Sequence, residues 1–300
     1  MTGLSVTTTE TSFNWRLNGR ITVLDNGARL PKQDDFLDLM ALNAFSVIAF
    51  DPASRLHDQE GLTDIDEFQL FSHVTLGNGE PATLFACLDA GLSGTLEPLP
   101  PERLPQASRQ GARLLSSIPV NSIALDAIEG LNSIDWLLLD DLNDSLTILK
   151  HGETALKDAL LFQVRLPFSP THQKQPDFAR VNQWMTRHGF RFYRLNNVNY
   201  QSHLPTDIEL ERQQATQMTC VDALFIPDND LIATLPAERL EKLAFLLDTV
   251  FDIHDFSYQV LNQNDPKRAR DYLISRGYIS RYHEEEDTFT LTAAYSPVPW

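Results

Sequence analysis

Four aspartates in this 300-residue chain each follow a largely apolar segment, a placement suited to binding or proton transfer. The aspartates are Asp25, Asp51, Asp140 and Asp141. The apolar segments that precede them are residues 21–24, 45–50 and 134–139. Carboxylates at the ends of strands can accept hydrogen bonds from ligand hydroxyl groups or take a proton from them. The sequence therefore predicts a small-molecule site where several strands end.

The first of these segments ends in a glycine turn, Asp25-Asn-Gly27. A glycine between a strand and a helix lets backbone N–H groups approach a nucleoside ligand closely. Asp51 follows at about the spacing that dinucleotide folds place between a glycine turn and the acid that binds ribose. Turns of this type, and Asp-Pro at a strand end, also occur for purely structural reasons. A nucleoside site and a purely structural turn therefore both stay open as interpretations.

His172 lies in the segment 167–176, which follows an apolar run at 160–166. This position predicts a place at the ligand edge, although a single histidine can also serve as a surface or capping residue. The other histidines do not have the spacing of metal ligands, and two cysteines cannot supply a tetrahedral thiolate site. The sequence predicts no metal, and Cys87 and Cys220 are expected to be reduced, buried packing residues.

Continuous apolar runs alternate with helical patterns along the chain, which indicates an α/β fold with a mostly parallel sheet covered by helices on both faces. The segments 68–76 and 82–88 predict a hairpin around a glycine turn. Residues 91–122, rich in proline and glycine, predict a long irregular connection that covers the site.

Three regions are expected along the chain: an N-terminal extension at 1–20, a Rossmann-like domain at 21–230 and a helical C-terminal extension at 231–300 packed on it. The helical extension could cover a sheet edge or mediate a homodimer. Within it, residues 278–282 and 288–294 predict a small hairpin.

The charge of the chain restricts its partners. The formal net charge is −17 and the pI is about 4.7, so the surface repels nucleic-acid phosphates and anionic lipids. Neither an apolar run of about 18 residues nor a signal peptide is found in the sequence. We therefore expect a cytoplasmic protein that binds neither nucleic acid nor membranes.

Three segments together resemble the FkbM-type methyltransferases, which use S-adenosylmethionine. Residues 137–150 resemble the family's strand and turn L-K-I-D-V-E-G, with Asp140 at the position of its aspartate. The segment 23–31 resembles D-x-G-A-N-x-G, and 47–52 resembles V-x-A-F-E-P with Asp51 in place of glutamate. The resemblance implies a Rossmann-like class I methyltransferase fold, whose seven-stranded sheet carries an antiparallel hairpin at one edge.

The resemblance also implies roles for individual residues. Cofactor contacts would come from Asp25, Gly27, Ala28, Arg29 and Asp51, and catalytic contacts from Asp140, Asp141 and His172. The implied activity is O-methyl transfer from S-adenosylmethionine to a hydroxyl of a sugar or small-molecule acceptor. The departures from the family pattern, at Arg29, Pro31, Leu138 and Leu142, favour the alternative of a catalytically inactive relative that serves binding or assembly.

Overall fold

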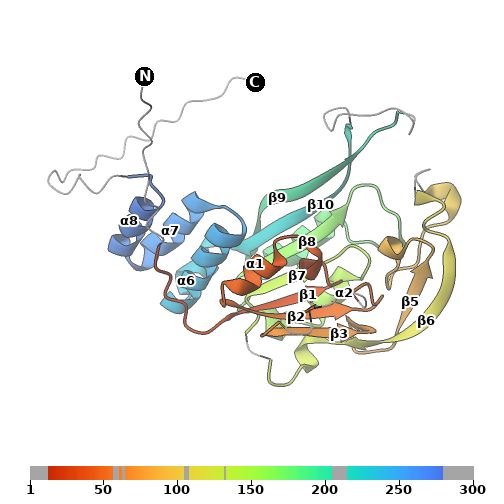
Figure 1. The fold of residues 1–300 in the computed structure, drawn as a ribbon, viewed down its shortest axis with the longest axis horizontal. Coiled ribbons are helices and arrows are strands. Elements are labelled where there is room, and N and C mark those ends of the chain that lie inside the picture. The colour runs from red at the N-terminus through yellow and green to blue at the C-terminus, as the bar shows by residue number, and fades with distance from the viewer. Residues whose placement is uncertain are drawn as a thin grey trace. The chain divides into compact units, whose positions relative to one another are not determined.

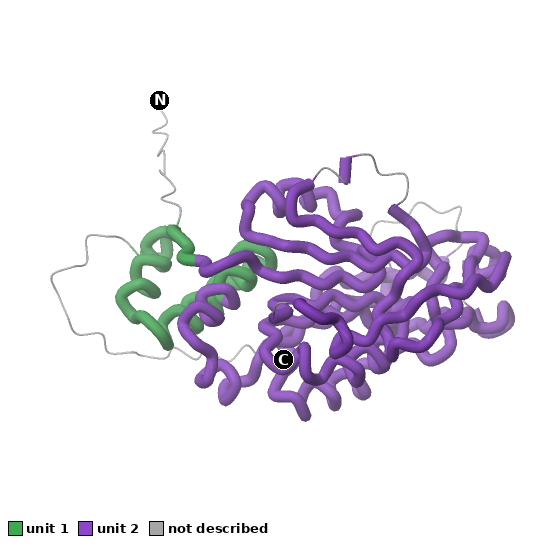
Figure 2. The backbone as a smooth tube through the Cα atoms, turned by 90° about the horizontal axis from the view of Figure 1, so that it is seen from below, with its two compact units in different colours: residues 1–16, 244–300 green, residues 17–243 purple. Residues whose placement is uncertain are grey.

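The computed structural model describes residues 13–56, 61–62, 65–104, 108–131, 133–204 and 215–279. The chain divides into two compact units (Figure 2). The sheet unit spans residues 17–243, and the helical unit comprises residues 1–16 and 244–300. The domain boundaries expected after residues 20 and 230 stay a prediction. The predicted hairpin of 278–282 with 288–294 lies outside the described residues, apart from its first two positions.

A seven-stranded mixed sheet forms the centre of the sheet unit, in the order β3-β2-β1-β7-β8-β10-β9 (Figure 1). Its strands are β1 (Ile21–Asn26), β2 (Phe45–Asp51), β3 (Phe68–Ser72), β7 (Trp136–Leu139), β8 (Leu161–Pro167), β9 (Phe190–Gln201) and β10 (Gln217–Pro227). Neighbouring strands from β3 to β8 are parallel, whereas β10 is antiparallel to both β8 and β9. The α/β class, the largely parallel sheet and its antiparallel edge are thus confirmed.

The register of the sheet brings the ends of three strands to one edge. Asp25 in β1 pairs with Ala49 in β2 and with Leu138 in β7. Asp51 and Asp140 each lie two residues beyond these partners, so all three carboxylates belong to the carboxyl edge of neighbouring parallel strands. Ligands of open α/β sheets bind at such an edge.

The eight α-helices of the described residues cover this sheet and build the helical unit. They are α1 (Phe36–Ala41), α2 (Ser145–Lys150), α3 (Glu153–Leu156), α4 (Phe178–Arg187), α5 (Asn229–Thr234), α6 (Ala237–Phe245), α7 (His254–Asn264) and α8 (Pro266–Ser275). The sequence of α4 accounts for both of its ends. Its N-cap Asp177 accepts a hydrogen bond from the Arg180 amide at 2.9 Å, and Gly189 follows its end with a φ of +80°.

Helices lie on both faces of the main sheet. Trp184 of α4 packs edge-on against Phe162 of β8, within the core that also holds Leu24 of β1. Phe36 of α1 packs against Phe68 of β3, which pairs through β2 with Val23. Because successive strand residues point to opposite faces, the neighbours Leu24 and Val23 place α4 and α1 on different sides. The predicted two-sided cover is therefore confirmed.

A separate three-stranded sheet corrects two predictions. It consists of β4 (Val74–Leu76), β6 (Leu114–Ile123) and β5 (Ala82–Cys87), in that order. Because β6 lies between β4 and β5, the predicted hairpin of 68–76 with 82–88 is wrong. The expected irregular connection is also wrong where β6 forms. Most of β6 is exposed, so its sequence lacks the apolar run or the alternation that marks a strand.

The helical unit has its own buried polar centre. The Asp248 carboxylate, which is 3% exposed, accepts hydrogen bonds from the Tyr272 hydroxyl at 2.5 Å and contacts His254 Nδ1 at 2.8 Å. Arg276 pairs with the same carboxylate. Asp265 caps α8 by accepting a hydrogen bond from the Arg268 amide at 3.1 Å.

Candidate functional site

The turn after β1 holds a fully buried carboxylate. Asp25 Oδ2 accepts a hydrogen bond from the Leu30 amide at 2.7 Å, and Oδ1 has no partner among the described residues. Burial raises the pKa of the Asp25 carboxyl, against the opposing effect of Arg29. Gly27 has a φ of +111° and Ala28 a φ of +48°, so the chain reverses here through left-handed backbone. That conformation is costly for alanine.

Gly27 lies directly against Asp140 at the end of β7. A Cβ atom at position 27 would lie 2.5 Å from Asp140 Oδ2 and 2.8 Å from its Cβ atom. The missing side chain therefore lets the ends of β1 and β7 approach each other. This close approach brings the glycine turn and the carboxylate of β7 into one site.

Replacing Gly27 by alanine should lower the free energy of unfolding by ~1–3 kcal/mol, because the new methyl group meets Asp140 and the backbone is strained. Chemical denaturation measures this loss. Gly19→Ala is the control, because Gly19 also has a positive φ (+72°) but no atom within 4 Å of the added Cβ. An equal loss in both variants would show that contact with Asp140 contributes nothing.

Asp51 is bound by the turn after β2 in the same manner as Asp25. Its Oδ2 atom accepts a hydrogen bond from the Leu56 amide at 2.9 Å, and Oδ1 has no partner among the described residues. The side chain is 1% exposed. Each of these two acids thus accepts from the backbone amide five residues later and keeps one buried oxygen without a donor.

Asp140 is the third buried carboxylate of this edge. Its Oδ1 atom accepts a hydrogen bond from Asn143 Nδ2 at 2.7 Å, and Oδ2 has no partner among the described residues. The Asp140 carbonyl accepts from the Ser145 hydroxyl at 3.1 Å, which fixes the turn into α2. Burial raises the pKa of the Asp140 carboxyl to about 6, with Arg55 and Asn143 opposing the shift.

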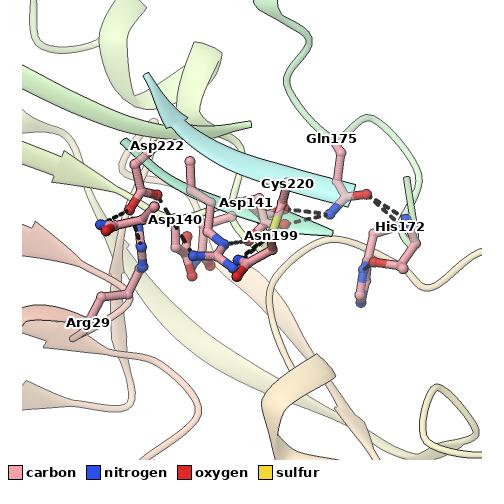
Figure 3. A network of polar contacts seen from close by, with 12 residues as sticks. Arg29, Asp140, Asp141, His172, Gln175, Asn199, Cys220 and Asp222 are labelled. Atoms are coloured by element: carbon pink, nitrogen blue, oxygen red, sulfur yellow. Dashed lines mark hydrogen bonds and ion pairs between the residues drawn. The ribbon is translucent and has the colours of Figure 1, made fainter. Parts of the chain in front are cut away.

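Arg29 belongs to a buried network centred on Asp222 of β10 (Figure 3). Its Nη2 atom donates to Asp222 Oδ2 at 2.9 Å, and the same oxygen accepts from Gln163 at 3.2 Å and Asn197 at 3.0 Å. Burial alone would raise the pKa of the Asp222 carboxyl, but Arg29, Asn197 and Arg165 together hold it below its ordinary value. Arg29 is therefore fixed across the strand ends by an acid of a distant strand.

Arg165 of β8 continues this network toward Asp141. The Arg165 guanidinium lies 3.8 Å from Asp222 Oδ1 and 3.6 Å from Asp141 Oδ1. It also donates to Cys220 Sγ at 2.9 Å, and Asn199 donates to the same sulfur at 3.1 Å. Cys220 is half-buried rather than buried as predicted, because it is on the strand face that meets this polar network. The prediction that Cys87 is buried is confirmed.

His172 is 2% exposed and has both ring nitrogens engaged. Nε2 lies 2.9 Å from the Leu92 carbonyl oxygen, and Nδ1 lies 2.9 Å from the Thr171 hydroxyl. Burial lowers the pKa of the His172 imidazole, so the neutral ring can donate to Leu92 and accept from Thr171. This geometry gives His172 the role of holding residue 92 beside the strand edge, and its catalytic role stays a prediction.

A cavity of about 440 Å³ opens at this edge. It is lined by Arg29, Lys32, Arg55, Gly91, Leu92, Asp140, Asp141, Leu142, Arg165, Pro167, Ser169, Thr171, Thr219 and Cys220. Of the predicted site residues, Arg29, Asp140 and Asp141 thus meet at one cavity. Asp25, Gly27, Ala28, Asp51 and His172 are not in its lining, although Gly27 lies directly behind Asp140.

The sequence interpretation missed four charged residues of this site: Lys32, Arg55, Arg165 and Asp222. Asp222 carried a signal, because it is the single charge inside the otherwise apolar run 221–226. Arg165 is a similar exception in 160–166. A charge in a continuous apolar strand predicts a buried partner. Lys32 ends a short 3-10 helix and Arg55 lies in a turn, and a cation carries no such signal at either place.

The described residues contain no group of three or more histidine, cysteine, aspartate and glutamate side chains that could hold a metal ion. Within the same part of the chain, no helix is long and apolar enough to cross a membrane.

No protein-family profile and no curated protein sequence matches the chain. Solved structures of distant similarity include a protein from Thermoplasma acidophilum provisionally described as a methyltransferase (8% identity, TM-score 0.36). They also include an S-adenosylmethionine-dependent methyltransferase from Aquifex aeolicus (12%, 0.33) and the 1,6-didemethyltoxoflavin-N1-methyltransferase of Burkholderia thailandensis (13%, 0.29). The alignments cover 71%, 71% and 70% of this chain, and 70%, 85% and 72% of the other chains. The function of this chain has to be argued from its own residues.

Proposed function

We propose that this chain is an S-adenosylmethionine-dependent O-methyltransferase of the FkbM type that acts on a hydroxyl of a sugar or small-molecule acceptor. One observation carries the proposal. Asp25, Asp51 and Asp140 end three neighbouring strands, all are buried, and each keeps one oxygen without a hydrogen-bond donor among the described residues. A buried acceptor left unsatisfied costs about 1–3 kcal/mol, so three of them at one edge indicate a ligand that supplies donors.

The donor chemistry of S-adenosylmethionine fits these acids. Asp51 would accept from the ribose hydroxyls, Asp25 and the Gly27 turn would hold the nucleoside end, and Asp140 would face the positive sulfonium. The cofactor would supply the methyl group. Arg29 has one guanidinium nitrogen, Nη1, without a partner among the described residues, which could pair with the cofactor's carboxylate.

Asp140 is the residue best suited to the acceptor. It lines the cavity, and its pKa of about 6 lies close to neutral pH, where general bases are most effective. The carboxylate would orient the acceptor hydroxyl and take its proton, while the methyl group passes from sulfur to oxygen and S-adenosylhomocysteine is released. Asp141, at the rim of the same cavity, is bound to Arg165 and would position the acceptor rather than react.

A second candidate is a catalytically inactive methyltransferase-like protein that serves binding or assembly. The Arg29–Asp222 pair favours it, because a buried guanidinium fixed at 2.9 Å from its acid occupies space beside the strand ends. Asp25 and Asp51 would then act only as caps of the turns that follow them. The two candidates differ in whether an adenosyl ligand binds.

S-adenosylhomocysteine at 100 times its Kd should raise the free energy of unfolding of the wild type by ~2.7 kcal/mol, seen as a higher melting temperature. Asp51→Ala should remove most of this stabilisation, because the ribose hydroxyls lose their acceptor. Isothermal titration gives the Kd directly.

Asp126→Ala is the matched control for this experiment. Asp126 also accepts from a backbone amide, that of Ala155 at 2.8 Å, but it is exposed and lies outside the cavity lining. This variant should keep the ligand response. The absence of a response in wild type and both variants at millimolar ligand would refute the methyltransferase proposal and leave the inactive relative.

A further inference from the structure

The cavity at the strand edge is lined by more cations than acids, which is unusual in a chain with an excess of acids. The sequence contains 24 lysines and arginines against 41 aspartates and glutamates, and its net charge is −17. Yet four cations line the cavity, Arg29, Lys32, Arg55 and Arg165, against two acids, Asp140 and Asp141. Cations concentrated at one concave site of an acidic protein attract anionic ligands.

Two of these cations are already neutralised. Arg29 and Arg165 share the buried carboxylate of Asp222, at 2.9 Å and 3.8 Å. Arg165 also lies 3.6 Å from Asp141. These contacts link two guanidinium groups with two carboxylates, so Arg29, Arg165, Asp141 and Asp222 together are close to neutral. Of the two guanidinium groups, Arg29 keeps one nitrogen, Nη1, for a ligand.

Lys32 and Arg55 have no such acid. The Lys32 amine has no hydrogen bond or ion pair among the described residues. Arg55 donates through Nη2 to the Ser93 carbonyl, a neutral acceptor, and its buried Nε atom has no partner in the described part of the chain. Burial and the neighbouring Arg55 lower the pKa of Lys32, against the opposing effects of Asp51, Asp25 and Asp140. Two cations thus lie close together beside the cavity without a direct counterion.

The remaining polar groups of the lining suit a hydroxylated molecule. Ser169, Thr171 and Thr219 contribute hydroxyl groups. Asp140, which is 2% exposed, has an oxygen without a donor. The cavity volume of about 440 Å³ is within the range of small-molecule sites. A phosphate or carboxylate matches the Arg55 fork and the Lys32 point charge.

We propose that the acceptor is a hydroxylated organic anion, a sugar phosphate or a sugar acid, whose anionic group binds between Lys32 and Arg55 while a hydroxyl reaches Asp140. This inference rests on the proposed function, because it names the class of its acceptor. It extends that function by assigning Lys32 and Arg55 to acceptor specificity.

The test is equilibrium binding to the full chain, at fixed ionic strength and with S-adenosylhomocysteine saturating. The probes are inorganic phosphate, D-glucose 6-phosphate, D-glucuronate and neutral D-glucose. The phosphate and carboxylate sugars distinguish the two kinds of anion. At least one anionic sugar should bind, and glucose should bind at least 10-fold more weakly. Equal binding of charged and neutral sugars, or no binding of any probe, would overturn the inference.

Variants of Lys32 and Arg55 test whether these two side chains bind the anionic group of the sugar. Lys32→Met and Arg55→Met should each weaken binding of the anionic sugar by ~10–100-fold, because each removes a charge-assisted hydrogen bond to its anionic group. Lys157→Met makes the same change of charge at a side chain that is 68% exposed and outside the lining, so it should bind as the wild type does. Unchanged binding in both site variants, once their melting temperatures show that they are folded, would overturn the assignment.

Measuring S-adenosylhomocysteine binding in every variant separates this inference from the proposed function. If the ligand binds the wild type and both site variants, the proposed function stands whatever the sugars do. If Lys32→Met or Arg55→Met abolishes S-adenosylhomocysteine binding instead, these cations hold the cofactor's carboxylate and the acceptor inference is wrong. If sugar anions bind but S-adenosylhomocysteine does not, the cavity is an anion site and the methyltransferase proposal fails.

Discussion

Asp222→Ala should lower the free energy of unfolding by ~3–5 kcal/mol, because it leaves a buried guanidinium without its acid. Asp222 is fully buried, and the Arg29 side chain that it neutralises is only 17% exposed. Gln163 and Asn197 also lose their acceptor in this variant. Urea denaturation with two-state analysis measures the loss.

A variant that lacks both partners shows whether the ion pair is the cause. Arg29→Met combined with Asp222→Leu removes both charges, and replacing a buried pair by apolar residues is often neutral or stabilising. The double variant should therefore be much more stable than Asp222→Ala. Asp228→Ala removes only the N-cap of α5, a 2.8 Å bond to the Leu231 amide, and should cost ~1 kcal/mol. A loss no larger at Asp222 than at Asp228 would contradict the buried-pair account.

Asp140→Asn should become more stable relative to the wild type as the pH rises. The pKa of the Asp140 carboxyl is raised from 3.8 to about 6 in the folded protein. At about 1.4 kcal/mol for each pKa unit, this shift corresponds to ~3 kcal/mol. Below pH 3.8 the carboxyl is protonated in both states. Between that value and about 6, the unfolded chain loses the proton first, so the wild type loses stability that the asparagine variant keeps.

Unfolding free energies at several pH values between 4 and 7.5 test this prediction. The asparagine oxygen can still accept from Asn143, so the contact at 2.7 Å is retained. Asp126→Asn, at an exposed aspartate, is the control for the loss of one charge. A stability difference between Asp140→Asn and the wild type that does not change with pH would show that burial of Asp140 has no such cost.

The central strands of the main sheet, such as β1 and β7, could be predicted from the sequence because they are buried on both faces. β1 and β7 have no exposed residue, so their sequences are mainly apolar, with Thr22, Asp25 and Asn26 as the polar residues of β1. β6 could not be predicted, because an exposed strand needs no apolar pattern. The single strand predicted over 68–76 divides at His73, whose φ of +61° separates β3 from β4. A histidine gives no reason to predict that the strand ends there.

The candidate site was predicted in part. Asp25, Asp51 and Asp140 were identified because a carboxylate that ends an apolar run is visible in a single segment. The partner of Arg29 was not, because Asp222 lies 193 positions away and only the pairing of β8 with β10 brings it near. The cofactor and catalytic roles of all the predicted site residues, Asp25, Asp51 and Asp140 included, stay predictions. The structure adds that Arg29 already has a buried acid.

The position of β10 also governs when the site can form during synthesis. The ribosome releases the segment with Arg29 long before Asp222, since 193 positions separate them. β10 lies between β8 and β9, and among the described strands β9 pairs with β10 alone, so β9 joins the sheet only once β10 has been made. In a nascent chain that ends before β10, the Arg29 guanidinium lacks its acid. The last strand of the sheet to be synthesised therefore supplies the carboxylate that neutralises Arg29.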